Sequence, residues 1–121
     1  MSVFRLSKKS SLKNTSDIDA VFKNGQKISS ELISLHYVGS GRKKLKIAFS
    51  VGKKSHSLAS TRNKLKRLMK EAFRLNAKDI VGDAVNYDFV FVYFGSDKVS
   101  FVQVEECMKS LLLSFRNKVL S

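Results

Sequence analysis

The residues best placed to do chemistry in this sequence are the cationic side chains in the middle of the chain. The stretch TRNKLKRLMKEAFR, residues 61–74, contains six Lys or Arg residues and one acid, interspersed with apolar residues. At about 100° per residue, the apolar and polar side chains of a helix with this sequence fall on opposite arcs. The apolar arc is formed by Leu65, Leu68, Met69, Ala72 and Phe73, and the opposite arc by Arg62, Asn63, Lys66, Arg67, Lys70 and Arg74. One face therefore suits a protein core, and the other is open to a partner.

The sign of the charges indicates what the polar face binds. A solvated helix face usually mixes acids and bases four residues apart, but Arg62, Lys66 and Lys70 repeat one sign at that spacing. Only Glu71 offsets them. Phosphates would neutralise this repulsion, with arginine binding them bidentately and lysine acting as a point charge. We interpret the face as a phosphate-binding surface; an ordinary charged outer face is the alternative.

The charge of the whole chain favours the same partner class. Among 121 residues there are 23 Lys or Arg and 10 Asp or Glu, which gives a net charge of +13. Such an excess costs self-repulsion unless a polyanion binds, so nucleic acid is the expected partner. No apolar run approaches the roughly 18 residues that span a bilayer, and the opening MSVFRLSKKS lacks the apolar region of a signal peptide. We expect a cytoplasmic protein that forms a single domain (1–121). Its N-terminal segment (1–12) is basic and can be flexible.

Catalysis by the chain alone has little support in the sequence. A self-contained nuclease needs converging carboxylates for a metal ion, or paired histidines for acid–base chemistry. The neighbouring acids are interpreted as caps or surface charges: Asp17 with Asp19, Asp79 with Asp83 in an expected loop around Gly82, and Glu105 with Glu106. Cys107 is interpreted as a small buried hydrophobe. We therefore predict no catalytic residue, no metal site and no cofactor bound by the protein itself.

Other elements must hold the cationic helix in place. NTSDIDAVFKNG, residues 14–25, places capping residues before two acids and ends in Asn24-Gly25, which predicts a short helix. Residues 28–38 and 45–51, separated by the turn GSGRKK, are rich in strand-forming residues and predict an antiparallel hairpin. NYDFVFVYF, residues 86–94, is continuously apolar and predicts a strand that is buried on both faces.

The helix boundaries follow from capping residues. Ser57 or Ser60 is expected to cap the cationic helix, which should run to about Leu75. The last helix is expected to begin with a capping box of Ser100 and Gln103, and its apolar spacing continues to Leu120. Helices alternating with short strands imply an α+β fold, an α/β sandwich in which helices pack on a small, mostly antiparallel sheet.

The cationic helix and its flanks resemble the protein component of bacterial ribonuclease P. In that family an Arg-Asn pair is followed by Lys-Arg and then by a Glu-Ala-Phe-Arg tail on one helix. The residues that match in order are Arg62, Asn63, Lys66, Arg67, Lys70, Glu71, Ala72, Phe73 and Arg74. The preceding FSVGKKS and the opening FRLSKKSSL…DAVFKNG also resemble the family, so the similarity covers nearly the whole chain.

The resemblance implies a subunit of an RNA-based endonuclease that removes the 5′ leader from precursor tRNA. The implied partners are the catalytic RNA subunit and precursor tRNA, with no membrane and no obligate protein partner. The RNA would carry the catalysis, and magnesium would be required by the RNA–protein complex through the RNA phosphates. The resemblance also implies an unusual left-handed crossover from strand to helix to strand.

The resemblance further implies where RNA is bound. The residues at the positions where the family contacts the catalytic RNA are Lys53, Lys54, Arg62, Asn63, Lys66, Arg67 and Lys70. The residues at the positions that form the family's cleft for the single-stranded leader are Ile18, Phe22, Ser34 and His36. Ile18 and His36 stand where the family is expected to have aromatics, and KKSHSLASTRN is one residue longer than the family's loop and lacks its Gly-x-Ala pattern.

Two other functions remain open at this point. A general RNA-binding or ribosome-associated protein would fit the same basic helix, because small sheets with basic helices host several such roles. A regulator of duplex DNA would need a recognition helix and commonly a dimer interface, and the sequence indicates neither. For Phe22, the alternative to leader binding is packing in the core. For His36, the alternative is that it is an ordinary surface residue of a strand.

Overall fold

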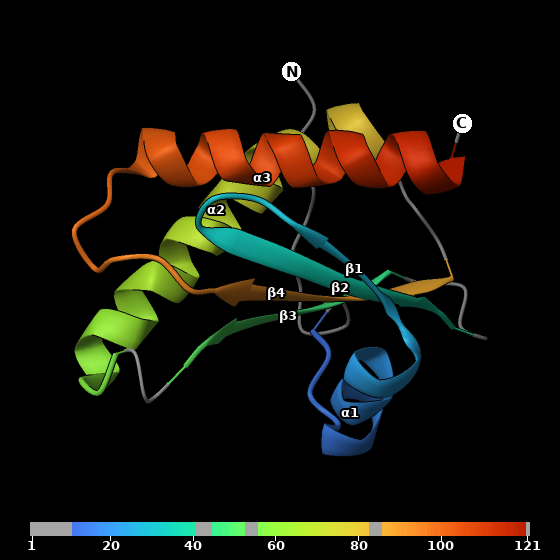
Figure 1. Cartoon of the computed structure of the whole chain (residues 1–121), viewed down its shortest axis with the longest axis horizontal. Helices are drawn as coiled ribbons and strands as arrows, with labels where there is room; N and C mark the ends of the chain where they lie inside the picture. Colours follow the sequence, from blue (N-terminus) through green and yellow to red (C-terminus); the bar gives the residue numbers. More distant parts are fainter. Residues whose placement is uncertain (1–10, 41–44, 53–55, 83–85, 121) are drawn as a thin grey trace.

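Helices cover both faces of a small sheet in this protein (Figure 1). The computed structural model describes residues 11–40, 45–52, 56–82 and 86–120. The helices are α1 (Thr15–Asn24), α2 (Ala59–Val81) and α3 (Phe101–Phe115), which continues into the π-helical turn η2 (Arg116–Leu120). The strands are β1 (Gln26–Ser29), β2 (Ile33–Gly39), β3 (Lys46–Val51) and β4 (Tyr87–Tyr93). The predicted α+β class is confirmed.

The two inner strands of the sheet are β2 and β4, in the strand order β1-β2-β4-β3. The position of β4 is decisive for the topology. This strand pairs antiparallel with β2 and parallel with β3, and its burial on both faces agrees with its continuous apolar sequence. The predicted hairpin of residues 28–38 with 45–51 is therefore wrong, because β4 lies between them. The expected single strand over 28–38 is also divided, since the Ser30 hydroxyl donates to the Ile33 carbonyl at 2.7 Å and closes a tight turn.

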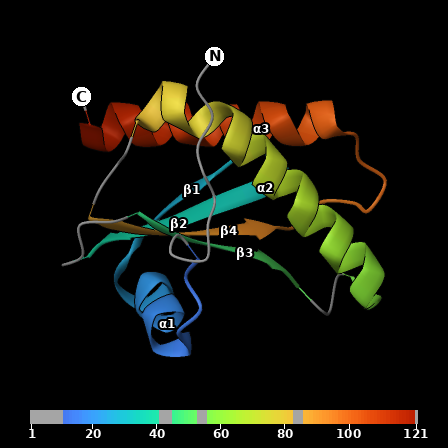
Figure 2. The same ribbon diagram turned by 180° about the vertical axis from the view of Figure 1, so that it is seen from behind.

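The connection from β3 to β4 passes over one face of the sheet through α2. The two strands are parallel neighbours, so strand, helix and strand form a crossover unit. Viewed from the side of α2 with the strands pointing upward, β4 lies to the left of β3, which makes the crossover left-handed (Figures 1 and 2). Roughly 98% of such connections have the opposite hand. This rare hand, which the resemblance implied, is thus a specific feature of the fold.

The main core lies between the sheet and the layer formed by α2 and α3 (Figure 2). Phe73 of α2 and Phe91 of β4 are both fully buried, with ring centroids 5.6 Å apart. The helix continues to Val81, beyond the predicted end near Leu75, because Ala77 and Val81 continue the four-residue spacing of buried positions that includes Phe73.

This longer helix changes the interpretation of the acids near its end. Asp79 lies within α2 rather than in a loop, and Asp83 lies outside the described residues. Cys107 of α3 is buried in the main core, as predicted.

A smaller core lies under α1, on the opposite face of the sheet. Val21 of α1 and Val90 of β4 are buried there together with Leu12, whose backbone N–H donates to the Ile47 carbonyl at 2.8 Å. The last residues of the basic N-terminal segment are therefore packed, whereas residues 1–10 lie outside the described residues. Gly25 caps the carboxyl end of α1, and only glycine fits there because a Cβ atom would lie 2.4 Å from the Val21 carbonyl oxygen.

The capping box at the start of α3 gives a stability prediction. The Ser100 hydroxyl accepts from the Gln103 backbone N–H, and the Gln103 side chain accepts from the Ser100 N–H at 2.9 Å, which confirms the predicted box. Ser100→Ala is expected to lower the free energy of unfolding by about 1 kcal/mol, measured by urea denaturation. Ser110→Ala, at an exposed position in the same helix, is the control, and equal losses in both variants would contradict the prediction.

Candidate nucleic-acid interface

The outer face of α2 is basic and accessible over its first half. Asn63, Arg67 and Lys70 are exposed, whereas Leu65 and Met69 on the opposite side are buried. The expected division into an apolar and a cationic face is therefore confirmed for this part of the helix. Lys66 is half-buried, and Lys53 and Lys54 lie outside the described residues.

Arg62 is held by two backbone carbonyls of the segment before α2. Its guanidinium Nη1 donates to the carbonyls of His56 at 2.9 Å and Ser57 at 2.8 Å. These bonds tie the first turn of α2 to the segment before it. Since arginine has five N–H donors, the remaining edge of the guanidinium is available to an anion. Arg62 thus combines a bracing role with a partly exposed positive charge.

The amino end of α2 lacks the side-chain cap that the sequence predicted. Its N-cap residue is Leu58, which has no capping oxygen, so neither Ser57 nor Ser60 performs this role. A helix without a side-chain cap leaves backbone N–H groups at its first turn, at the positive end of the helix dipole. The result is a second source of positive potential beside the cationic face.

Glu71 pairs with a cation of its own helix. The Arg74 guanidinium donates to both carboxylate oxygens, with a distance of 3.1 Å from Nε to Oε2. This hydrogen bond lowers the pKa of Glu71 below its ordinary value. Because the pair neutralises the carboxyl-terminal part of the cationic face, the positive charge of α2 is concentrated toward Arg67 and the amino end.

A second candidate surface lies where α1 meets the sheet. The Phe22 side chain is 46% exposed, and its ring contacts His36 edge-on with centroids 4.7 Å apart. The Ser34 hydroxyl lies 3.3 Å from Nε2 of His36 and is itself buried. The structure therefore brings three of the four predicted cleft residues into contact. Ile18 instead packs, partly buried, against the smaller core under α1.

The electrostatic environment of His36 opposes its protonation. Its ring is partly buried, and Lys27 stands directly opposite it in the β1–β2 ladder. Burial, followed by the positive charge of Lys27, lowers the pKa of His36 from its ordinary value of 6.5. At neutral pH the ring is therefore uncharged, and it offers an aromatic edge and a hydrogen-bonding nitrogen rather than a positive charge.

This shift predicts a stability that depends on pH. As pH falls below about 6.5, the histidine of the unfolded chain binds a proton before the folded one does, so folding becomes less favourable. We expect the melting temperature to decrease between about pH 7.5 and about pH 5.5, and His36→Gln to reduce that decrease. A variant that retains the full pH dependence would show that another group is responsible.

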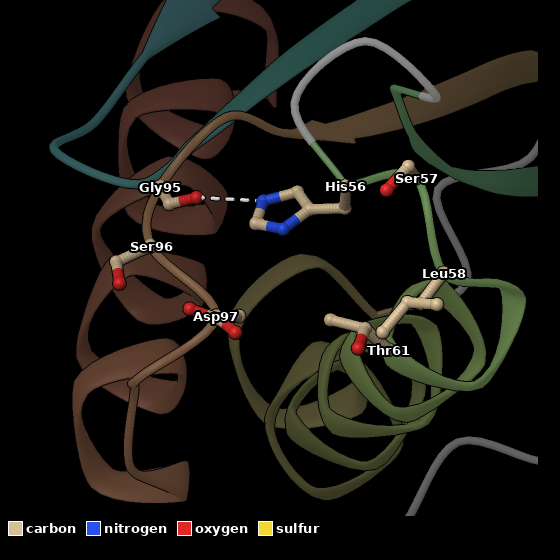
Figure 3. Close-up of a pocket in the computed structure, with 7 residues that line it drawn as sticks. All are labelled: His56, Ser57, Leu58, Thr61, Gly95, Ser96 and Asp97. Carbon is tan, nitrogen blue, oxygen red and sulfur yellow. Dashed lines mark hydrogen bonds between the residues drawn. The ribbon is translucent and has the colours of Figure 1, made fainter.

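A polar pocket lies between the amino end of α2 and the segment after β4 (Figure 3). Its lining residues are His56, Ser57, Leu58, Thr61, Gly95, Ser96 and Asp97. His56 is 8% exposed, and its Nε2 lies 2.9 Å from the Gly95 carbonyl oxygen. The sequence carries no local signal for this pocket, because His56 and Gly95 are 39 positions apart.

The described parts of the chain contain neither a cluster of metal ligands nor a helix that could span a membrane. Within residues 11–40, 45–52, 56–82 and 86–120, no three His, Cys, Asp or Glu side chains come together as metal ligands. None of the helices in those ranges has the length and apolar character needed to cross a membrane.

The comparison with known families decides between the remaining possibilities. The sequence matches the family model described as Ribonuclease P over residues 6–116. This chain belongs to the ribonuclease P protein family. The family's ribonuclease P protein component from Clostridium kluyveri is 36% identical over 103 residues, which covers 84% of this chain and 89% of the relative. The component from Borreliella afzelii is 34% identical over 110 residues and covers 85% of this chain and 93% of the relative.

Solved structures of the family have the same fold. The RNase P protein from Thermotoga maritima superposes with a TM-score of 0.72 at 27% identity, covering 85% of this chain and 94% of that one. The Staphylococcus aureus RNase P protein superposes with a TM-score of 0.73 at 19% identity, covering 85% of this chain and 92% of that one, and supports the fold alone. The family resemblance of the cationic helix is thus confirmed.

Proposed function

We propose that this protein is the RNA-binding subunit of ribonuclease P and assists a catalytic RNA in removing the 5′ leader from precursor tRNA. Membership of the family carries this proposal, and the exposed basic face of α2 supports it. In the proposal the RNA subunit supplies the active site. Magnesium ions are required by the complex and are held by RNA phosphates, while the protein contributes binding.

The catalytic RNA binds the cationic face of α2 in this proposal. The contacting residues are Arg62, Asn63, Lys66, Arg67 and Lys70, together with Lys53 and Lys54. Exposure of Arg67 and Lys70 at the centre of the face supports the assignment, because phosphates would relieve the repulsion between neighbouring cations. The Arg62 brace supports it further, since a helix whose first turn is fixed loses less entropy on binding.

The 5′ leader binds the surface between α1 and the sheet, at Phe22, Ser34 and His36 with Ile18 beside them. Single-stranded RNA is commonly held by aromatic rings on which bases stack, at about 1 to 3 kcal/mol per base. The half-exposed ring of Phe22 supports this role over a role in the core. His36, held by Ser34 and uncharged at neutral pH, adds a hydrogen-bonding group beside the ring.

The two surfaces belong to opposite sides of the sheet. α1 lies on one face, and α2 lies with α3 on the other (Figure 1). A protein of this shape can contact the catalytic RNA through one side and the leader of its substrate through the other. The proposed function is therefore a bridge that raises the affinity of the complex for substrates that carry a leader.

Cleavage of a precursor tRNA with a short 5′ leader tests the proposal. A bacterial ribonuclease P RNA is incubated with the substrate at low magnesium, with and without this protein, and the protein alone is the control. We expect release of the leader at the mature 5′ end only when RNA and protein are both present. Binding to RNA without any gain in cleavage, even with the RNA from the same source, would favour a general RNA-binding role instead.

A further inference from the structure

The pocket between the amino end of α2 and residues 95–97 has the size and polarity of a small-ligand site (Figure 3). Its volume is about 360 Å³, within the usual range for sites that hold small molecules. Ser57 and Thr61 line it together with the imidazole of His56 and the carboxylate of Asp97, whereas the Ser96 side chain points away from it (Figure 3). These groups both donate and accept hydrogen bonds, so the pocket suits a polar ligand that can do both.

His56 provides a buried acceptor that faces this pocket. A carbonyl oxygen only accepts, so the bond to Gly95 requires the hydrogen of the neutral ring to be on Nε2. Nδ1 then carries a lone pair, and in Figure 3 it points into the pocket, toward Asp97 and Thr61. No protein donor to Nδ1 is found among the described residues. A nitrogen in a ring that is 8% exposed would gain a hydrogen bond from a bound ligand.

The amino end of α2 provides donors beside that acceptor. The Arg62 N–H bonds to the Leu58 carbonyl, but the N–H groups of Ser60 and Thr61 have no acceptor within the part of the chain that is described. Such groups lie at the positive end of the helix dipole and favour a phosphate oxygen. One wall of the pocket therefore favours an anion.

The opposite wall is held rigidly and carries a negative charge. The Tyr93 hydroxyl donates to the Ser96 carbonyl, and the Ser96 hydroxyl accepts from the Lys98 N–H at 3.1 Å. A Cβ atom on Gly95 would lie 2.4 Å from Cδ2 of Leu32, which shows how closely this segment is packed. The Asp97 side chain extends from this fixed segment at the edge of the pocket (Figure 3). This wall therefore favours hydrogen-bond donors.

We propose that this pocket binds one ribonucleotide unit of an RNA strand. Its phosphate accepts from the first N–H groups of α2. Its 2′-hydroxyl, the one ribose hydroxyl that is free within a strand, donates a hydrogen bond that is shared between the Asp97 carboxylate and Nδ1 of His56. A simple anion would be repelled by Asp97, and a simple cation by the helix end, whereas a phosphate joined to a ribose satisfies both walls. The 2′-hydroxyl makes the site selective for RNA over DNA. The choice of RNA as the polymer rests on the proposed function.

Titration of the free, isotope-labelled protein with mononucleotides tests this proposal by NMR. We expect AMP to shift the backbone amide signals of Ser60, Thr61 and Asp97, and dAMP to bind about tenfold more weakly, because it lacks one hydroxyl that donates to a charged acceptor. Equal affinity for AMP and dAMP would overturn the proposal. So would inorganic phosphate that binds as tightly as AMP, or shifts that are not localised at the pocket.

Two substitutions identify the groups responsible. Asp97→Asn removes the charged acceptor, and His56→Gln keeps a donor to Gly95 through its side-chain amide while removing the nitrogen that faces the pocket. Each is expected to reduce the tenfold preference for AMP to about twofold or less. Asp19→Asn, an exposed charge on α1, is the matched control and should keep the preference. A preference unchanged in both pocket variants would overturn the assignment. The cleavage assay tests the proposed function, and the titrations test the nucleotide pocket. Because the two measurements are independent, either proposal can fail without the other.

Discussion

Replacing Arg67 with alanine is expected to weaken binding to ribonuclease P RNA about tenfold while leaving the fold intact. The side chain is exposed on the outer face of α2, opposite the buried Leu65 and Met69, so its removal opens no cavity. In the proposed complex its guanidinium contacts phosphate, and this contact releases a counterion from the RNA. Its loss therefore reduces both the affinity and the dependence of affinity on salt.

Binding measured over a series of salt concentrations checks this expectation. The slope of log affinity against log salt should become shallower by about one for Arg67→Ala. Lys109→Ala, which removes a charge from an exposed position on α3, should leave the slope unchanged. Arg67→Lys should keep the slope but recover only part of the affinity, because lysine cannot bind phosphate bidentately. An unaltered slope for Arg67→Ala would exclude a direct phosphate contact at this position.

Phe22→Leu is expected to reduce the preference for leader-bearing precursor over mature tRNA by about tenfold. In the proposal the phenyl ring stacks on a leader base, and leucine preserves apolar volume but offers no ring. Since the side chain is 46% exposed and contacts His36 edge-on, the change should lower the free energy of unfolding by less than about 1 kcal/mol. The variant should therefore lose leader preference while it keeps most of its free energy of unfolding.

The neighbouring Val21 provides the matched control for Phe22. It lies on the same helix but is fully buried in the smaller core. Val21→Ala should lower the melting temperature more than Phe22→Leu does and leave the leader preference of the folded fraction unchanged. The experiment compares affinities for precursor and mature tRNA in the presence of the RNA subunit. Parallel losses of stability and of leader preference in Phe22→Leu would assign the ring to the core instead.

Local signals in the sequence were sufficient for most of the helices. Asn14 caps α1 by accepting from the Ser16 N–H at 2.9 Å, and the capping box of α3 forms as expected. Each of these features depends on residues two or three positions apart, which a linear pattern can show. The candidate surface on α2 could be predicted for the same reason, since its two faces follow from helical spacing alone.

Partners that are distant in the sequence could not be predicted in this way. The composition of β2 and β3 indicates two strands, but only the position of β4 shows that they do not pair with each other. Likewise, the fold brings His56 to Gly95 from 39 positions away, so no local pattern in the sequence predicts the pocket. The resemblance to the family supplied the left-handed crossover, for which the residues themselves give no pattern.

The position of β4 also determines when the fold can form during synthesis. β4 is the last strand to be made. In the described sheet β2 pairs only with β1 and β4, and β4 is the one strand beside β3, which otherwise has an isolated bridge from Ile47 to Ser11. A nascent chain that ends before Tyr87 therefore holds α1 and the cationic helix without a sheet to join them. Folding depends on contacts between distant parts of the sequence, which raises the contact order and slows it. Until β4, the sixth element of the chain, leaves the ribosome, the two proposed RNA-binding surfaces exist only as separate segments.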